Sequence, residues 1–383
     1  MKIFKTQLRS WRKSLLLCVV ISTVSFLLIH FLFQILTLLK EESWFDPKKV
    51  ATIDPWVKKH WKHVKIVTKP NRVQTSKTIL LWTKFFGISD YVPKLSTLGC
   101  PKPKCFITSD RRFLNKSDAL VFHLRDINLK DLPAYRNKNQ VWILVHHESP
   151  HHTPDVLKYL NGLFNWTATY RSDSDIGLTP VAKRLKHADS KAVNYARGKK
   201  RMVAWLVSNC KTPSKRELFV KELQKSILVD IYGKCGKLSC FPVQSEECYE
   251  KLGKMYRFYL SFENSICKDY VTEKFFNILH TNMIPVVMGG ANYSAIAPPS
   301  SYIDALSFKS PKELAQFLLN VAKDEKKFNS YFAWKNTHYV TIDAYACQIC
   351  KKLHEPLVES HYYKNISYWW FGDANCKSWN IFP

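Results

Sequence analysis

The sequence has no internal repeat and no low-complexity tract, which excludes solenoids and arrays. Glycine is scarce, with 11 among 383 residues, and acidic residues are few. Lys and Arg number 58 against 31 Asp and Glu, so the formal net charge is +27. This imbalance favours polyanionic partners, and nucleic acid, an acidic membrane surface or a phosphorylated small molecule all fit it. Because 46% of the residues are hydrophobic, the chain is too apolar for disorder and can bury one large core or two medium ones.

The first 13 residues lack acids and carry five basic side chains: Lys2, Lys5, Arg9, Arg12 and Lys13. An apolar run follows from Leu15 to Leu39, and at about 1.5 Å per residue it spans a hydrocarbon core of roughly 30 Å. We expect a cytoplasmic tail at residues 1–13 and a transmembrane signal-anchor at 14–39, because the basic flank stays in the cytoplasm. A cleaved signal peptide fits less well, since its apolar core is shorter and a small-residue cleavage site follows it.

Cysteines and glycosylation sequons indicate the compartment. Of 11 cysteines, Cys18 falls in the predicted anchor, and the remaining ten form an even set that an oxidising lumen would allow to pair. Four Asn-x-Ser/Thr sequons occur, at Asn115, Asn165, Asn292 and Asn365. We therefore expect a single-pass type II membrane protein of the secretory pathway with a luminal globular part, and this argues against nucleic acid as the partner of the positive charge.

The rest of the chain is predicted to form two α/β lobes. Residues 40–75 are charged and Trp-rich and predict a short stem. An N-terminal lobe at 76–200 follows, then a second lobe at 201–345 and a C-terminal segment at 346–383 that packs back on the N-terminal lobe. Buried-strand runs in the first lobe occupy 79–82, 119–123 and 141–145. In the second lobe, strand runs at 202–207, 229–233, 258–262 and 284–288 alternate with helical patterns at 214–228 and 269–279. This alternation predicts two Rossmann-like halves with parallel sheets and a cleft between them.

The segment Phe262–Lys274 has the densest functional signal. A strand ends, a polar turn follows, and a helix begins with Asp269 or Thr272 as its cap. Backbone N–H groups at a helix start favour an anion, and Lys274 adds a positive charge beside them. Glu273 could accept hydrogen bonds from ribose hydroxyls. A purely structural alternative is that Glu273 and Lys274 are an exposed helix pair.

That segment resembles the donor motif of the α-1,3-fucosyltransferase family, Phe-Glu-Asn-Ser, three residues, then Asp-Tyr-(Val/Ile)-Thr-Glu-Lys. Further stretches resemble the family at 105–111, 148–150, 163–167, 170–175, 284–289 and 292–293. The resemblance covers roughly residues 78 to 376. It implies a two-lobed GT-B fold, with residues 76–200 as the acceptor-side lobe and 201–345 as the donor-binding lobe. It also implies an enzyme of the Golgi membrane that transfers L-fucose, with inversion, from GDP-β-L-fucose to the 3-hydroxyl of N-acetylglucosamine in glycoprotein or glycolipid glycans.

The resemblance also implies the site. GDP-fucose contacts carry over to Ser208, Asn209, Arg216, Tyr259, Asn264, Tyr270, Glu273 and Lys274. Glu148 matches the family's general base, and an inverting transfer needs such a carboxylate to take the proton of the acceptor hydroxyl. Arg216, Lys274 and helix N–H groups would stabilise the charge that grows on the departing GDP. We therefore expect no required cofactor and no metal site, while stimulation by Mn or Mg, and a homodimer, stay open.

Three other groups of residues have spacings that are typical of metal sites or disulfides. Four imidazoles surround Glu148, at His146, His147, His151 and His152, but no further pair is spaced to complete a zinc site. The D-x-D at 173–175 would hold manganese in a GT-A transferase, yet it is distant in sequence from the donor motif, so salt bridging or capping is favoured. The C-x-x-C of Cys347 and Cys350 is better read, with Cys100 and Cys105, as a cross-link between the ends of the globular part. In the resembling family such terminal cysteines form disulfides.

Two departures from the family pattern bear on specificity. Residues 177–180 replace Val-Pro-Tyr-Gly, so a donor-contacting tyrosine is missing, and Ile88 stands where many Lewis-type members have an acceptor-contacting Gln. Lactosamine, its GalNAc-containing analogue and the N-glycan core stay open as acceptors. An inactive relative that binds glycans or partners at a membrane, and a metal-dependent GT-A transferase, are the alternative functions.

Overall fold

The computed structural model describes residues 65–67, 76–89, 92, 100, 104–137, 139–177, 181–185, 193–341, 344–355 and 362–380. The predicted cytoplasmic tail and signal-anchor, and the predicted stem apart from residues 65–67, lie outside these ranges. In the described ranges no helix has the length and apolar character needed to cross a membrane.

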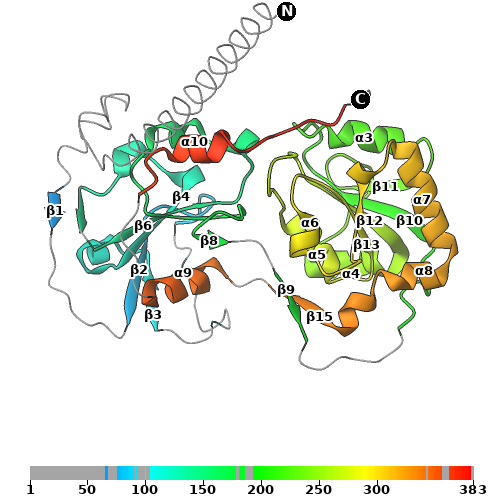
Figure 1. The fold of residues 1–383 in the computed structure, drawn as a ribbon, viewed down its shortest axis with the longest axis horizontal. Coiled ribbons are helices and arrows are strands. Elements are labelled where there is room, and N and C mark those ends of the chain that lie inside the picture. Colours follow the sequence, from blue (N-terminus) through cyan, green and yellow to red (C-terminus); the bar gives the residue numbers. More distant parts are fainter. Residues whose placement is uncertain are drawn as a thin grey trace, which may run out of the picture. The chain divides into compact units, whose positions relative to one another are not determined.

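The first lobe is built on a six-stranded sheet in the order β3-β2-β4-β6-β7-β8, and every neighbouring pair in it is parallel (Figure 1). Its strands are β2 (Lys77–Leu81), β3 (Cys105–Thr108), β4 (Ala119–His123), β6 (Val141–His146), β7 (Trp166–Thr169) and β8 (Ile176–Gly177). All residues of β4 and β6 are buried. Strands covered on both faces read as continuous apolar runs, which explains why the sequence predicted them closely.

Short 3₁₀ helices make most of the connections in this lobe. They are η2 (Arg111–Lys116), η3 (Leu124–Asp126), η4 (Leu129–Asp131), η5 (Pro150–His152) and η6 (Asp155–Tyr159). A further parallel pair joins β1 (Lys65–Val67) to β5 (Tyr135–Asn137). The helix α9 (Tyr345–His354) comes from the far end of the chain and packs Ile349, Cys350 and Leu353 into the core of this sheet. The lobe is therefore completed by a distant segment of sequence.

The second lobe is built on a five-stranded parallel sheet in the order β11-β10-β12-β13-β14. The strands are β10 (Arg201–Leu206), β11 (Val229–Tyr232), β12 (Tyr256–Phe262), β13 (Ile284–Met288) and β14 (Ile303–Asp304). The helical segments are α3 (Arg216–Leu223), α4 (Glu246–Met255), α5 (Glu273–Leu279), α6 (Tyr293–Ile296), η7 (Ala305–Ser307), α7 (Pro311–Lys323), α8 (Glu325–Ser330) and η8 (Ala333–Asn336). Side chains from α3, α7 and α8 join the strands in the main core. A small antiparallel pair, β9 (Val181–Arg184) with β15 (His338–Thr341), accompanies this lobe.

The predicted α/β class with parallel sheets is confirmed, but two helix starts were wrong. The helix predicted from residue 269 begins at Glu273, because Asp269 has a φ of 62° and cannot continue a right-handed helix. The helix predicted from residue 214 begins at Arg216 for the same reason, since Lys215 has a φ of 55°.

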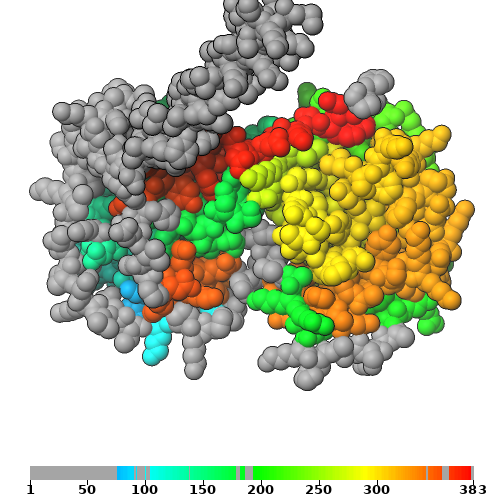
Figure 2. Space-filling model, in the orientation of Figure 1, coloured from blue at the N-terminus to red at the C-terminus, as the bar shows by residue number. Residues whose placement is uncertain are grey.

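The end of the chain contacts both sheets. Helix α10 (Ile366–Phe371) buries Trp370, whose indole N–H donates to Thr153 Oγ1 at 2.7 Å in the first lobe. Beyond it, residues 373–380 contact the second lobe, and the backbone N–H of Trp379 donates to the Ser214 carbonyl at 3.1 Å. The predicted packing of residues 346–383 on the N-terminal lobe thus describes α9 and α10 but misses the last described residues. The segment lies at the surface in Figure 2.

All ten cysteines outside the predicted anchor form disulfides. Cys100 pairs with Cys347 and Cys105 with Cys350, so two bridges hold α9 to the start of the first sheet. The other pairs are Cys210–Cys235, Cys240–Cys248 and Cys267–Cys376. The cross-link between the two ends of the globular part is therefore present, with a connectivity that the sequence left open.

Candidate functional site

The strand order of the second lobe creates a switch point between β10 and β12. Chain connections leave these neighbouring strands in opposite directions, and in open α/β sheets ligands bind beyond the carboxyl ends of strands at such a point. Ser208 and Asn209 follow β10 directly, and Asn264 follows β12. The topology therefore brings three predicted donor contacts, far apart in sequence, to the same edge of the sheet.

Arg216 is anchored at this edge. Its side chain is only 4% exposed, Nη1 donates to the Phe262 carbonyl at 2.5 Å, and Nη2 donates to the Asn209 carbonyl at 3.3 Å. Burial lowers the pKa of Arg216, and the negative charges of Glu263 and Glu217 oppose that shift. Its Nε is buried without a hydrogen-bond partner in the described part of the chain. The guanidinium is thus held by a carbonyl at the end of β12 and a carbonyl shortly after β10, and its Nε–H remains able to donate a further hydrogen bond.

Asn264 presents the complementary feature. Its backbone carbonyl accepts from the Ser214 N–H at 3.0 Å, which fixes the turn after β12. Its side-chain Oδ1 is buried and finds no partner within the described residues. Since buried polar atoms are nearly always hydrogen-bonded, Asn264 Oδ1 and Arg216 Nε are both candidates for a hydrogen bond to a polar ligand.

Lys274 belongs to a compact charged cluster at the start of α5. Its Nζ lies 2.7 Å from Thr272 Oγ1, 3.2 Å from Glu273 Oε1 and 3.3 Å from Glu263 Oε2. Although burial lowers the pKa of Lys274, the charges of Glu263 and Glu273 outweigh this and raise it. For Glu273, burial raises the pKa but the positive charge of Lys274 and its hydrogen bond give a net lowering. Both side chains are therefore charged at neutral pH.

The backbone N–H of Thr272 is not free for an anion. It donates to the carboxylate of Glu263 at 2.8 Å, and the Thr272 hydroxyl donates to the same group. The prediction of an anion held by free N–H groups at the helix start is wrong for this donor. The positive charge at this position comes from the side chain of Lys274.

Two predicted tyrosines are buried beside the cluster. Tyr259 packs edge-to-face on Tyr249, with ring centroids 5.9 Å apart, and Tyr270 packs in the same way on Tyr170 at 4.9 Å. Burial raises the pKa of Tyr270, and three nearby carboxylates add to this effect, those of Glu263, Glu148 and Glu273. The Tyr270 hydroxyl thus stays protonated, and it lies in the field of carboxylates from both lobes.

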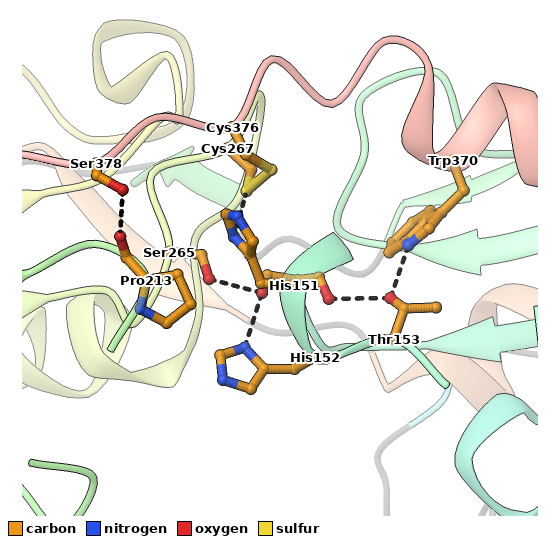
Figure 3. The surroundings of a disulfide bond; sticks show 10 residues. His151, His152, Thr153, Pro213, Ser265, Cys267, Trp370, Cys376 and Ser378 are labelled. Atoms are coloured by element: carbon orange, nitrogen blue, oxygen red, sulfur yellow. Dashed lines mark hydrogen bonds between the residues drawn. A yellow bond between two sulfur atoms is a disulfide. The ribbon is translucent and has the colours of Figure 1, made fainter. Parts of the chain in front are cut away.

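Glu148 lies just beyond β6 in the first lobe. Its Oε1 accepts from Arg125 Nη1 at 3.3 Å, and the side chain is partly exposed. The next residue, Ser149, has its Oγ 2.8 Å from Ser265 Oγ, immediately after Asn264 in the second lobe. Burial lowers the pKa of His152, with opposing and assisting charges from Glu148 and Arg216 respectively. Figure 3 shows His152 and Ser265, whose side chains both form hydrogen bonds with Ser149 Oγ. The predicted base and the predicted donor residues therefore share one neighbourhood.

The imidazoles near Glu148 do not converge on a metal in the described part of the chain. His146 bonds to Thr153 Oγ1 at 3.0 Å, His152 to Ser149 Oγ at 3.0 Å, and His151 lies 3.7 Å from Cys267 Sγ. Two described clusters have ligand-like spacing, namely Cys105, Cys350 and His354, and His151, Cys267 and Cys376. Each contains a disulfide, so its sulfur atoms are not available as thiolate ligands.

The D-x-D carboxylates are fully engaged. Asp173 pairs with Arg171 at 2.7 Å, and Asp175 accepts from the Thr167 N–H at 2.9 Å, as salt bridging and capping predicted. Although the D-x-D and the donor motif are far apart in sequence, they are close together in the structure. Ser172 donates from its N–H and its hydroxyl to Asp269 of the donor motif, at 3.1 and 2.7 Å.

One predicted glycosylation site is contradicted. Asn165 is 4% exposed, and its Oδ1 accepts from the Trp142 N–H at 2.8 Å and from buried Arg136. A glycan on this amide has no room, because the side chain is packed within the first sheet. The other three sequon asparagines are exposed: Asn115, Asn292 and Asn365.

Sequence reasoning missed a buried His–Asp pair at the carboxyl end of β4. His123 Nδ1 lies 2.5 Å from Asp126, whose carboxylate also accepts from the N–H groups of Phe86 and Gly87 at 2.8 and 3.0 Å. This fixes the tight turn that precedes Ile88, which is 58% exposed. His123 and Asp126 are only three residues apart in sequence, but they match no motif, and their link to Phe86 and Gly87 forms only in the folded chain. Glu263 was also missed, because it reads as the end of a strand.

Comparisons with known proteins agree along most of the chain. Residues 74–180 match the model of the fucosyltransferase N-terminal domain, and residues 196–369 match that of the glycosyltransferase family 10 (fucosyltransferase) C-terminal domain. The chain is 38% identical to "Alpha-(1,3)-fucosyltransferase C" of Drosophila melanogaster, over 80% of each protein. It is 36% identical to "4-galactosyl-N-acetylglucosaminide 3-alpha-L-fucosyltransferase FUT6" of Homo sapiens, over 76% of this chain and 82% of the human protein.

A solved structure described as an alpha1,3-fucosyltransferase with GDP-fucose is also similar. The TM-score is 0.49 at 13% sequence identity, over 80% of this chain and 98% of the solved one.

Proposed function

The chain belongs to glycosyltransferase family 10, the fucosyltransferases, and we propose that it transfers L-fucose with inversion from GDP-β-L-fucose to the 3-hydroxyl of N-acetylglucosamine in a glycan. The observation that carries the proposal is the meeting of Glu148 with the donor edge of the second lobe. The Ser149–Ser265 hydrogen bond at 2.8 Å, and the influence of Glu148, Glu263 and Glu273 on Tyr270, support one shared site for donor and acceptor.

The donor side provides two cations and two orphaned polar groups. Arg216 and Lys274 are charged and buried or half-buried, so they would interact strongly with a diphosphate. The unpartnered Nε of Arg216 and Oδ1 of Asn264 would find hydrogen-bond partners on a nucleotide. As the bond to fucose breaks, negative charge grows on GDP, and preorganised cations stabilise it. Glu273 is exposed and suited to accept from ribose hydroxyls.

The acceptor side provides the base. Glu148 accepts from Arg125 Nη1 at 3.3 Å, and a carboxylate at this position is the kind of group that serves as a general base. In an inverting transfer this carboxylate takes the proton of the acceptor hydroxyl, whose oxygen attacks the anomeric carbon opposite the leaving GDP. The proton moves to Glu148 and the electron pair of the broken bond moves to the diphosphate, so the step balances within the two substrates and one carboxylate.

We further propose that the reaction requires no metal cofactor, because Arg216 and Lys274 supply the positive charge that a metal would supply to a diphosphate. The D-x-D carboxylates are tied to Arg171, Thr167 and neighbouring groups, which disfavours the metal-dependent GT-A alternative. Stimulation by Mn or Mg is separate from a metal requirement, and rates measured with either ion added to the EDTA-free reaction would reveal it.

The compartment and overall architecture are also part of the proposal. The apolar run at 14–39, three exposed sequons and five disulfides support a type II Golgi membrane protein with a luminal GT-B catalytic part. For the acceptor, the human relative's description specifies a 4-galactosyl-N-acetylglucosaminide, whereas exposed Ile88 replaces a hydrogen-bonding amide with an apolar group. Lactosamine, its GalNAc-containing analogue and the N-glycan core are the acceptors to compare.

The test is to incubate the purified chain with GDP-fucose and a panel of these three acceptors, with and without EDTA. We expect a product one fucose heavier, a 3-linkage to N-acetylglucosamine by tandem mass spectrometry and α-anomeric fucose by NMR, in both conditions. Absence of any fucosylated product would refute the transfer function, and loss of activity in EDTA would refute the metal-independent part.

A further inference from the structure

Glu263 is a fully buried carboxylate at the end of β12, with 0% of the residue exposed. Its oxygens accept from the Thr272 N–H at 2.8 Å and from the Thr272 hydroxyl at 2.9 and 3.0 Å, and Oε2 lies 3.3 Å from Lys274 Nζ. The Thr272 hydroxyl accepts from Lys274 Nζ at 2.7 Å while it donates to Glu263. The ammonium is therefore linked to the carboxylate both directly and through one hydroxyl.

The surroundings of Glu263 leave it little freedom to move. Its backbone N–H donates to the Met288 carbonyl at 2.9 Å, and its carbonyl accepts from Ser214 Oγ at 2.8 Å. The side-chain stem passes Gly289, where an added Cβ would lie 3.4 Å from Glu263 Cγ and 2.3 Å from Tyr293 Oη. The backbone and the side-chain stem of Glu263 are therefore both fixed, and this limits where its carboxylate and the groups bonded to it can lie.

We propose that Glu263 is a positioning residue for the donor site, which acts by fixing the Lys274 ammonium, directly and through the Thr272 hydroxyl, where it meets the diphosphate of GDP-fucose. This inference rests on the proposed function. A buried carboxylate has a desolvation cost that a neutral side chain would avoid. A role in fixing the Lys274 ammonium would explain why a carboxylate occupies this position.

The charges that face Lys274 agree with this role. Glu263 from β12 and Glu273 from α5 raise its pKa against the lowering by burial, Arg216 from α3 opposes them, and the Tyr249 phenol from α4 also feels the Lys274 charge. Removing the Glu263 charge takes away the first of these two supporting carboxylates. The Lys274 pKa then falls, so donor binding weakens further as the pH rises toward about 10.

The experiment is a double-mutant cycle on GDP binding, measured by calorimetry with the full chain. Glu263→Gln keeps a hydrogen-bond acceptor for Thr272 but removes the negative charge that faces Lys274. We expect GDP to bind about tenfold more weakly, with a larger loss at alkaline pH. In the Lys274→Ala background the same change should have no further effect, because the group through which Glu263 acts is absent. Effects that multiply in the double variant, or unchanged or tighter binding by Glu263→Gln, would overturn the inference.

Glu217 offers a matched control. Its carboxylate also accepts from a threonine N–H and hydroxyl, those of Thr212, at 3.3 and 3.0 Å, but the structure gives it no lysine partner in the described ranges. Any effect of Glu217→Gln on GDP binding should therefore be the same with and without Lys274. An effect of Glu217→Gln that vanishes with Lys274 would show that the cycle does not isolate Glu263, and would overturn the assignment.

Two substitutions at Thr272 keep the test decisive if Glu263→Gln does not fold. Thr272→Ser retains the bridging hydroxyl and should bind GDP like the wild type, whereas Thr272→Val should bind more weakly, and only when Lys274 is present. Equal binding by the two variants would overturn the inference. A wild-type chain that neither binds GDP nor transfers fucose would instead refute the proposed function, so the two failures are distinguishable.

Discussion

Ser149 Oγ lies 2.8 Å from Ser265 Oγ, across 116 residues of sequence. Each serine directly follows a turn that begins where a central strand ends, β6 in one sheet and β12 in the other. Glu148 and Asn264 precede these two serines, so one hydrogen bond aligns the predicted base with the predicted donor edge. The two halves of the proposed active site therefore meet at this contact between the lobes.

Glu148→Gln tests the base. The amide cannot take a proton, so turnover should fall by about 10²- to 10⁴-fold while GDP binding stays near that of the wild type. Product formation and GDP calorimetry measure the two effects separately. Asp155→Asn is the control, because Asp155 is a highly exposed carboxylate of the same lobe that is also ion-paired, with Lys158. Near-normal turnover by Glu148→Gln would show that another group is the base.

His147 makes the free energy of unfolding depend on pH. Burial lowers its pKa to about 4, with a further contribution from His123, whereas an unfolded histidine has a pKa near 6.5. Between these values the unfolded chain binds a proton that the folded chain does not, so the free energy of unfolding falls as pH falls from about 6.5 to about 4. The loss should be at most about 3 kcal/mol. Urea unfolding across this range should show a shallower pH dependence for His147→Gln, and identical slopes would contradict the prediction.

The two bridges between α9 and the first sheet should be strongly non-additive. Each closes a long loop, with sequence separations of 247 and 245, yet their cysteines are close neighbours in the chain. While one bridge remains, the other closes only a short extra loop, so removing either one should cost about 2–3 kcal/mol in the chain-entropy model. Removing the second should then cost about 5 kcal/mol more. Thermal unfolding of Cys350→Ser, Cys347→Ser and the double variant measures this, and equal steps would contradict it.

Asn165 should carry no glycan and should matter for folding. Asn165→Ala leaves the Trp142 N–H and the buried Arg136 guanidinium without their acceptor, which should destabilise the chain by about 2–4 kcal/mol. Asn115→Gln at an exposed sequon should remove one glycan with little effect on unfolding. Mass spectrometry after glycosidase treatment, with urea unfolding of both variants, gives the comparison. Detection of a glycan at Asn165 in the folded protein would refute the buried assignment.

Much of the sheet architecture was predictable because doubly covered strands form continuous apolar runs. The predicted strands at 119–123 and 284–288 match β4 and β13 to the residue. Helix starts were less predictable, since they depend on single backbone angles. Asp269 has a left-handed backbone conformation, and its carboxylate accepts a hydrogen bond from Ser172 of the other lobe. The helix therefore cannot start at Asp269, although the sequence pattern from this residue looks helical.

The parts of the site that escaped prediction depend on contacts between distant elements. Glu263 lies inside the recognised motif, but its role becomes visible only when Thr272 and Lys274 fold back onto it. The His123–Asp126 pair likewise gains meaning from the turn before Ile88, which it fixes. An even cysteine count was compatible with full pairing, whereas the partner of each cysteine could be identified only from the fold.

The segment from residue 373 to residue 380 has a practical consequence for handling the protein. Asp373 bonds to Arg171 and Lys268, Cys376 forms a disulfide with Cys267 of the predicted donor motif, and Trp379 packs on Phe219 of α3. Affinity tags and fusion partners should therefore be attached on the amino-terminal side of the catalytic part. Removal of a dozen residues from the carboxyl end would delete Cys376 and with it the disulfide that holds the predicted donor motif at Cys267.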